Sequence, residues 1–438
     1  IIHSSIFNTI IALSTYFILL NFNLSKLWSL FYSILFSMLM YPVVGTPFVD
    51  HHSTIFLILS FYLFIFSVNK DNAISLFFIP FLFTISFLCK QTPASYGVIG
   101  AFFLIVLYAF LNKDIAKKIL VTSIFGTIFA ISFLLIFFYF TEIKIELFFE
   151  QYILFAKTIG GGRLGDFNFN ILNFFLDFNF INIYILALSF IIFKIPHKTT
   201  SNKKLLVSLI SVITLALVML LHQSITLNQN FVFFMIPLLA AITHVNYKYL
   251  FKNKNYLIII ILICSFAVIK YHLRFNEHRK FNELEKVDLS IAEDAASIHP
   301  RLKGLKWITS NNPTNPKLEI NDIKEAINVL KNEKKKMSLI TQYQIIAPIL
   351  SIYDHSPNQW HHPGISFPLK GHKYFNVYKN YFTKSLKKNK VEVIYSIGYG
   401  EGNLINYILD ASCFEKKQEG KLIYSFNLKK NCKDFNSN

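Results

Sequence analysis

Long apolar runs dominate the first 270 residues of this chain. A helix that crosses a bilayer needs about 20 mainly apolar residues, with a range of roughly 17–25. Ten runs predict helices near 5–22, 26–44, 54–68, 74–89, 95–111, 119–140, 171–193, 205–221, 231–245 and 256–270. These runs lack the strict alternation of apolar and polar residues that a membrane β-barrel requires. We therefore predict a polytopic α-helical membrane domain of about ten transmembrane helices over residues 1–270.

The pattern changes after residue 270. Residues 271–300 are charged and helix-prone, which predicts a linker. Beyond it, short β-branched and aromatic runs alternate with helical patterns, as in α/β folds. The predicted strands lie near 305–308, 337–341 and 391–397, and the predicted helices near 320–335 and 371–389. Residues 301–438 are thus expected to form a small α/β domain.

Composition supports the membrane class. The 438 residues are 53% hydrophobic and only 16% charged, with a mean hydropathy of +0.45. A soluble domain carries about 25% charged residues, so this chain has too few to cover a water-facing surface. The net charge of +18 does not indicate nucleic-acid binding, because no basic stripe with interleaved aromatic residues is present.

The positive charge is distributed unevenly between alternate loops. Loops 23–26, 69–72, 112–118, 194–204 and 246–255 hold twelve Lys or Arg, whereas loops 45–53, 90–94, 141–170 and 222–230 hold four. Lys and Arg accumulate in cytoplasmic loops, so the second set of loops and the C-terminal tail are predicted to lie outside. Together with a composition typical of AT-rich genomes, this predicts a bacterial inner membrane location with a periplasmic C-terminal domain.

The predicted state of the four cysteines follows from this orientation. An oxidising compartment permits disulfides, and Cys413 and Cys432 are the two cysteines of the predicted outer domain. They flank a predicted hairpin around residues 421–426, so we predict that they pair. Cys89 and Cys264 lie in or beside apolar runs and are expected to stay free.

The outer loop before the third apolar run holds the densest group of ionisable residues. Asp50, His51 and His52 stand where this run begins, and ionisable groups at that depth are costly and usually functional. A carboxylate and an imidazole two residues apart can share one divalent cation, Mg²⁺ or Mn²⁺, which makes Asp50 and His52 candidate metal ligands. The alternative is that Asp50 caps a helix while the histidines lie among lipid headgroups.

Two further outer segments carry candidate phosphate-binding groups. Lys90, followed by Gln91, runs against the positive-inside trend and calls for an anionic partner, a lipid phosphate or a neighbouring carboxylate, unless its side chain snorkels into the headgroups. Arg163 follows a glycine triplet and is suited to bidentate phosphate recognition. Glu150 lies in a stretch resembling an interfacial amphipathic helix and is a candidate carboxylate facing the same cavity.

The remaining candidates are uncharged. His222 opens a polar loop, 222–230, which could form a sugar-binding rim or an ordinary connection. Trp360 and His361 lie in a loop-like stretch of the tail that is suited to a sugar or metal contact, with a packed turn over the sheet as the alternative.

With these motifs in place, the chain resembles the GT-C superfamily of multi-spanning glycosyltransferases, which take sugar from polyprenyl-phosphate lipids. Asp50-His51-His52 looks like the Asp-His-His motif of archaeal oligosaccharyltransferase catalytic subunits, in which the Asp and the second His bind metal. The turn from Lys90 to Pro93 looks like one common in bacterial family 39-like transferases. The mixed α/β tail also matches the family's extracytoplasmic domain.

The chain departs from this family in two ways. The essential acid of the first outer loop is missing, which fits a start that has been truncated by one helix and equally fits an inactive relative. The Trp-Trp-Asp signature of oligosaccharyltransferases is also missing, which favours a glycan, lipid or hydroxyl acceptor over asparagine.

The resemblance implies direct displacement at the anomeric carbon, with polyprenyl phosphate as the leaving group. A carboxylate would act as general base, namely the missing acid helped by Asp50, while Arg163 and Lys90 would stabilise the departing phosphate. Glu150 is the other candidate catalytic acid. Gln91, His222, Trp360 and His361 are candidate substrate contacts. The competing interpretations are a transporter or flippase for a lipid-linked glycan, and a non-catalytic scaffold or sensor.

Overall fold

The computed structural model divides the chain into two compact units. It describes residues 2–42, 48–159, 170–196, 199–226, 232–278, 284–285, 287–358, 360–362, 364–399, 403–429 and 432. The first unit, here called the helical unit, comprises residues 1–144 and 162–280. The second, here called the tail unit, comprises residues 145–161 and 281–438. Each is described separately below.

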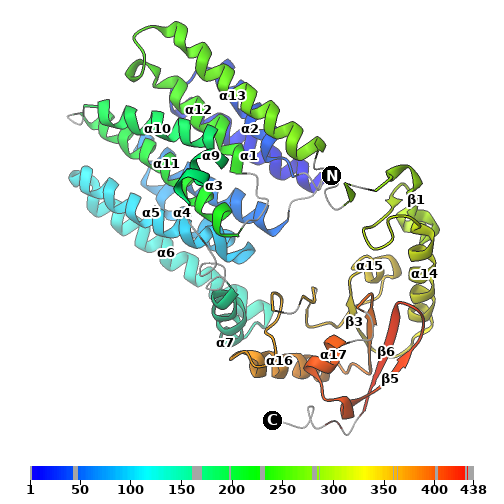
Figure 1. The fold of residues 1–438 in the computed structure, drawn as a ribbon. Coiled ribbons are helices and arrows are strands. Elements are labelled where there is room, and N and C mark those ends of the chain that lie inside the picture. Colours follow the sequence, from blue (N-terminus) through cyan, green and yellow to red (C-terminus); the bar gives the residue numbers. More distant parts are fainter. Residues whose placement is uncertain are drawn as a thin grey trace. The chain divides into compact units, whose positions relative to one another are not determined.

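The helical unit is a bundle of apolar helices (Figure 1). Its main helices are α1 (Ile2–Asn21), α2 (Lys26–Met40), α3 (Val49–Lys70), α4 (Ala73–Cys89), α5 (Gln91–Leu111), α6 (Lys113–Thr141), α9 (Ile171–Asp177), α10 (Asn179–Lys194), α11 (Thr200–Thr226), α12 (Met235–Val245) and α13 (Leu257–His272). Each predicted apolar run coincides with one of these helices, or with the pair α9 and α10. The helical class of the predicted domain is therefore confirmed.

Fewer than ten of the described helices meet the length and apolar composition of a full span. Within the described residues, six helices are long and apolar enough to cross a membrane, or seven if α9 and α10, bent by 99°, count as one broken span. Three further apolar helices, which include α2 and α4, have 10–17 residues. Several helices could thus cross a membrane, as expected of a multi-pass membrane protein, and the count of ten stays a prediction.

Helix α3 lies at the centre of the bundle. Within its most apolar window 72% of the residues are buried, compared with 17% for α6. It packs against α1, α4, α5 and α11, which enclose it on several sides. In contrast, α6 exposes large apolar side chains such as Phe125, Ile128 and Ile131. An exposed apolar face of this kind is unfavourable in water but matches the hydrocarbon of a bilayer.

The tail unit is built on a four-stranded sheet with the order β3-β4-β6-β5. The strands are β3 (Met337–Thr341), β4 (Val393–Ile397), β5 (Phe414–Gln418) and β6 (Ile423–Leu428). Strands β3 and β4 are parallel, with Met337 opposite Val393, whereas the other pairs are antiparallel. A separate two-stranded sheet joins β1 (Glu293–Asp294) to β2 (Lys306–Trp307). The sheet region predicted at the C-terminal end is confirmed.

Helices cover both faces of the larger sheet. Leu339 and Tyr395 pack on one face in a core that includes Ile323 and Ile327 of α14 (Pro316–Asn332). Ile340, Ile394 and Phe426 pack on the other face with residues of α16 (Phe375–Lys388) and α17 (Asn403–Ile408). Every residue of β3 and β4 is buried, as expected for parallel strands covered on both sides.

The segment after α6 belongs to the tail unit. Residues 145–155 form α7 (Ile145–Leu147) and the π-helical segment η1 (Phe148–Phe155), close to the predicted amphipathic stretch. Phe155 is buried, and its ring meets that of His372 edge-on with 5.5 Å between centroids. The predicted linker is only partly helical: a π-helical turn, η5 (Leu273–His278), follows α13, and short 3₁₀ turns follow from Leu289.

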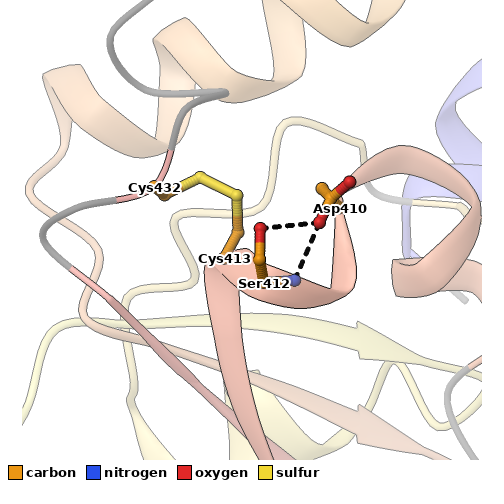
Figure 2. The surroundings of a disulfide bond; sticks show 4 residues. All are labelled: Asp410, Ser412, Cys413 and Cys432. Carbon is orange, nitrogen blue, oxygen red and sulfur yellow. Dashed lines mark hydrogen bonds between the residues drawn. A yellow bond between two sulfur atoms is a disulfide. The ribbon is translucent and has the colours of Figure 1, made fainter.

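Cys413 and Cys432 form a disulfide, which confirms the predicted pairing (Figure 2). Their Cα atoms are 4.4 Å apart, and both residues are buried beside the β5–β6 hairpin. Asp410 orders the turn before Cys413, because its carboxylate accepts hydrogen bonds from the backbone N–H of Ser412 at 2.8 Å and from its hydroxyl at 2.6 Å. Cys89 and Cys264 are free, as expected.

We expect the double substitution Cys413→Ser/Cys432→Ser to destabilise the tail unit by about 3 kcal/mol. A bond that closes a loop of roughly 20 residues removes this much chain entropy from the unfolded state. Pulse proteolysis of the whole chain in urea, with the tail fragment followed on a blot, measures the change. Cys89→Ser is the control, and an unchanged urea midpoint in the double variant would contradict the expectation.

Candidate functional site

Asp50 lies in the first turn of α3 and is 4% exposed. Helix α3 begins at Val49, five residues before the predicted start, so Asp50, His51 and His52 are helical residues rather than loop residues. The N-terminal end of a helix stabilises a carboxylate through its unpaired N–H groups and dipole. The local structure therefore favours an ionised Asp50 despite its burial.

Lys90 provides the opposite charge. It is the C-cap of α4 and immediately precedes α5, and its ammonium group forms an ion pair with Asp50 Oδ1. The C-terminal end of α4 favours a cation at Lys90, whereas the N-terminal end of α5, which Lys90 also caps, disfavours one, so the favourable charge partner of Lys90 is Asp50. Of the two partners considered for Lys90, the structure places it against the neighbouring carboxylate. Its side chain is 22% exposed, so part of it remains within reach of solvent or a ligand.

His222 approaches the same carboxylate from a third direction. Its Nε2 lies 3.7 Å from Asp50 Oδ1, and its side chain is fully buried. The prediction of a loop beginning at His222 is wrong, because α11 continues to Thr226, whose hydroxyl donates a hydrogen bond to the His222 carbonyl at 2.7 Å. This extra helical turn keeps the imidazole beside Asp50.

Two serines that sequence reasoning missed join the helix ends below the ion pair. The Ser86 hydroxyl donates to the Ser53 carbonyl at 2.6 Å, and the Ser53 hydroxyl donates to the Lys90 carbonyl at 3.2 Å. The two hydroxyl oxygens are 3.1 Å apart. Ser53 stands three positions after Asp50, which places both on one helix face. This spacing was the available signal, although nothing local indicates Ser86 as the partner.

His52 faces away from Asp50. Its Nδ1 is 2.9 Å from the Phe48 carbonyl oxygen, and its Nε2 is 3.2 Å from Nε2 of His3. Residues two positions apart on a helix do not face each other, so the expectation of one cation held by both Asp50 and His52 does not fit this arrangement. No group of three or more His, Cys, Asp or Glu that could hold a metal is found among the described residues.

The other predicted residues separate into two groups. Gln91 is the first residue of α5 and follows Lys90 directly. Glu150 lies in η1, which belongs to the tail unit, whereas Asp50 belongs to the helical unit. Arg163 and the preceding glycine triplet lie outside the described residues. The helical unit thus brings together Asp50, Lys90 and His222 from four helix ends.

Trp360 and His361 lie in the tail unit, in the stretch between α15 (Ile346–Leu350) and α16. Trp360 is half exposed, whereas His361 is 1% exposed. The Ser356 hydroxyl oxygen is 3.2 Å from His361 Nε2, and burial lowers the pKa of His361 to about 4. Both residues line one pocket, which is analysed below.

No protein-family model, curated protein or solved structure matches this chain. The basis for the candidate site is therefore its own geometry. A carboxylate, an ammonium group and an imidazole converge at one end of an apolar bundle, and such a group can accept a proton and bind an anion at one place.

We expect the Asp50–Lys90 pair to couple strongly in a double-mutant cycle. Asp50→Asn and Lys90→Met should each destabilise the helical unit, and the double variant by less than the sum, with a coupling of about 1–3 kcal/mol. The destabilisation of each variant is measured by heating the ligand-free protein in detergent and recording its aggregation. The pair Asp71–Lys204 is the control, since Asp71 is 53% exposed and such pairs contribute little. Additive effects at Asp50 and Lys90 would contradict the interaction.

We expect acid to destabilise the tail unit through His361. Its folded pKa of about 4 lies below the ordinary value of about 6.5, so the unfolded chain binds the extra proton between these values. Stability from the neutral buried ring is complete above pH 6.5 and falls, by up to about 3 kcal/mol, as the pH drops to 4. Urea pulse proteolysis at several pH values should show this slope in wild type and a flatter one in His361→Gln. Equal slopes would refute it.

Proposed function

We propose that this protein is a membrane glycosyltransferase that moves a sugar from a polyprenyl-phosphate donor to a hydroxyl group of a glycan or lipid acceptor. The observation that carries the proposal is the convergence of Asp50, Lys90 and His222 at one end of the bundle. The apolar outer faces of helices such as α6 suit a donor whose long lipid chain lies in the bilayer.

In the proposed reaction, the acceptor oxygen attacks the anomeric carbon while the bond from that carbon to the phosphate oxygen breaks. The Asp50 carboxylate takes the proton of the acceptor hydroxyl, and the bonding electron pair leaves with the phosphate. Lys90 neutralises the charge that develops on the phosphate oxygen. His222 positions Asp50 from the side opposite to solvent, since it is fully buried.

The Asp50–Lys90 ion pair predicts that the donor binds before Asp50 becomes active as a base. An ammonium group has three donors, and Lys90 uses one of them toward Asp50. A donor phosphate that binds Lys90 competes for this positive charge, which weakens its hold on Asp50 and leaves the carboxylate more basic. Binding of the leaving group would thereby prepare the base, so that Asp50 is shielded until a donor is present.

The distribution of polar groups favours this function over a transporter. Transporters place polar and ionisable residues within broken helices near the middle of the membrane. Here several buried hydroxyls inside the described helices bond to their own helix backbone, as Thr15, Ser211 and Thr243 do toward the carbonyl four residues earlier. The ion pairs of the helical unit lie at helix ends. This pattern suits chemistry at the membrane surface.

We expect Asp50→Asn to reduce sugar transfer by a factor of about 10²–10⁴, as loss of a general base does. The assay uses the chain reconstituted in lipid vesicles with radiolabelled undecaprenyl-phosphate mannose, glucose and arabinose, each offered with membrane lipid and glycan acceptors. Lys90→Met should lower kcat strongly as well. Asp71→Asn removes a carboxylate from the other ion pair and should retain activity within about twofold.

Two results would argue against the proposal. If Asp50→Asn transfers sugar at the wild-type rate while its protein level is unchanged, Asp50 is not the base. If no donor is consumed but labelled lipid crosses the bilayer in a protein-dependent way, the chain is a transporter.

A further inference from the structure

We infer that the tail unit contains a separate binding site for a neutral oligosaccharide, in a pocket beside the ends of β3 and β4. The pocket has a volume of about 450 Å³. Small-molecule sites typically fall between about 300 and 1,000 Å³, so it can hold a short sugar chain. The inference does not depend on the chemistry at Asp50, because the pocket belongs wholly to the tail unit.

The position of the pocket follows from the sheet. Strands β3 and β4 are parallel neighbours that end together at Thr341 and Ile397. In open α/β sheets, ligands bind beyond the carboxyl ends of such strands. The Gln342 N–H still donates to the Ile397 carbonyl at 3.2 Å, and Gly398, with a φ of +81°, then turns the chain away from β4. A side chain at Gly398 would meet Tyr343 at 3.0 Å, so this turn requires glycine.

The lining residues suit a neutral, hydroxyl-rich ligand. Beyond Thr341 at the end of β3, the pocket is lined by Gln342, Gln344, Trp360, His361, His362 and Tyr399. None of these residues carries a carboxylate, an ammonium or a guanidinium group. Amide and imidazole groups both donate and accept hydrogen bonds, as neighbouring sugar hydroxyls also do. A phosphate or a carboxylate would find no positive partner among them except a protonated histidine.

Trp360 provides the apolar surface that a sugar ring needs. It is 50% exposed, which is unusual for so large an aromatic side chain, and its ring is 5.4 Å from that of His362. The indole face can pack against the C–H groups of a pyranose, while its N–H remains available as a donor. Aromatic residues such as Trp are enriched in contact surfaces, and this one lines the pocket.

His361 supplies a second and independent observation. It is 1% exposed, and its Nδ1 has no hydrogen-bond partner within the part of the chain that the structure describes. A buried polar atom without a partner is costly, and this one belongs to a residue that lines the pocket. Since Nε2 lies 3.2 Å from the Ser356 hydroxyl, the orientation of the ring is already set.

Described residues on both sides of Trp360 and His361 are attached to α16. The Tyr378 hydroxyl donates to Asn358 Oδ1 at 3.1 Å, and Asn358 Nδ2 donates to the Ser366 carbonyl at 3.3 Å. The ring of Phe367 stacks on that of Tyr378 with 5.2 Å between centroids. These contacts attach Asn358 and Phe367, which flank the two pocket residues, to α16 and reduce the freedom that they would lose when a sugar binds.

The test measures binding of cellotetraose, mannotetraose and chitotetraose to the whole chain in nanodiscs by saturation-transfer NMR and calorimetry. We expect at least one of them to bind, Trp360→Ala to weaken it by about tenfold or more, and Trp360→Phe to retain part of the affinity. Tyr353→Ala is the matched control, because Tyr353 is a 78% exposed aromatic residue of the same unit that does not line the pocket. It should bind as wild type does.

Further variants keep the result independent of folding and of catalysis. Formation of the Cys413–Cys432 disulfide reports that a variant's tail unit has folded. Asp50→Asn should bind the saccharide with unchanged affinity, so failure of the transfer reaction does not mimic failure of this site. The inference is overturned if none of the three saccharides binds wild type, if Trp360→Ala binds equally well, or if glucose 6-phosphate binds better than any of them.

Discussion

In the described helices of the bundle, charged side chains lie near the helix ends, because hydrocarbon cannot solvate ions or unpaired backbone groups. The rest of the helical unit follows from this constraint. Several of its buried hydroxyls bond to the backbone of their own helices, as those of Thr15 and Ser211 do, and its outer faces carry large apolar side chains. Ionised groups can gather where helices begin and end, and this is where Asp50 and Lys90 are found.

The Asp50–Lys90 pair is more than a cancellation of two charges. Asp50 lies at the N-terminal end of α3, whose dipole stabilises a carboxylate, and the hydrogen bonds of Ser53 and Ser86 join this end to the C-terminal end of α4, where Lys90 stands. Removing either partner would leave a charge that is largely buried. The same pair gives the proposed site its chemistry, since a ligand anion that competes for Lys90 changes the basicity of Asp50.

The tail unit satisfies its polar groups in a different way. Its sheet pairs backbone groups between strands, helices cover both faces, and a disulfide closes the last hairpin. At the edge where β3 and β4 end, this arrangement leaves a pocket lined by neutral polar and aromatic groups. The proposed acid–base chemistry and the inferred neutral-sugar site thus lie in different units, and each can be tested without the other.

The sequence by itself determined the class of each part of the chain. Apolar run length predicted the helices, β-branched runs predicted β3 and β4, and the two cysteines of the tail predicted the disulfide. Run length and residue type are properties of short windows of sequence. The free energy gained by burying the apolar side chains of such a window depends little on which distant residues cover them. The ionisable residues Asp50 and Lys90 could also be singled out, because such groups are rare at that depth.

Only the tertiary structure decided which residues meet. Helix α3 starts five residues early, which turns His52 toward His3 and leaves Asp50 to Lys90 and His222. Asp50 and Lys90 are 40 positions apart, and Ser53 and Ser86 are 33 apart. The pocket around Trp360 likewise joins residues that follow two different strands. Contacts of this kind depend on helix register and on packing between distant segments, which no local pattern of residues specifies.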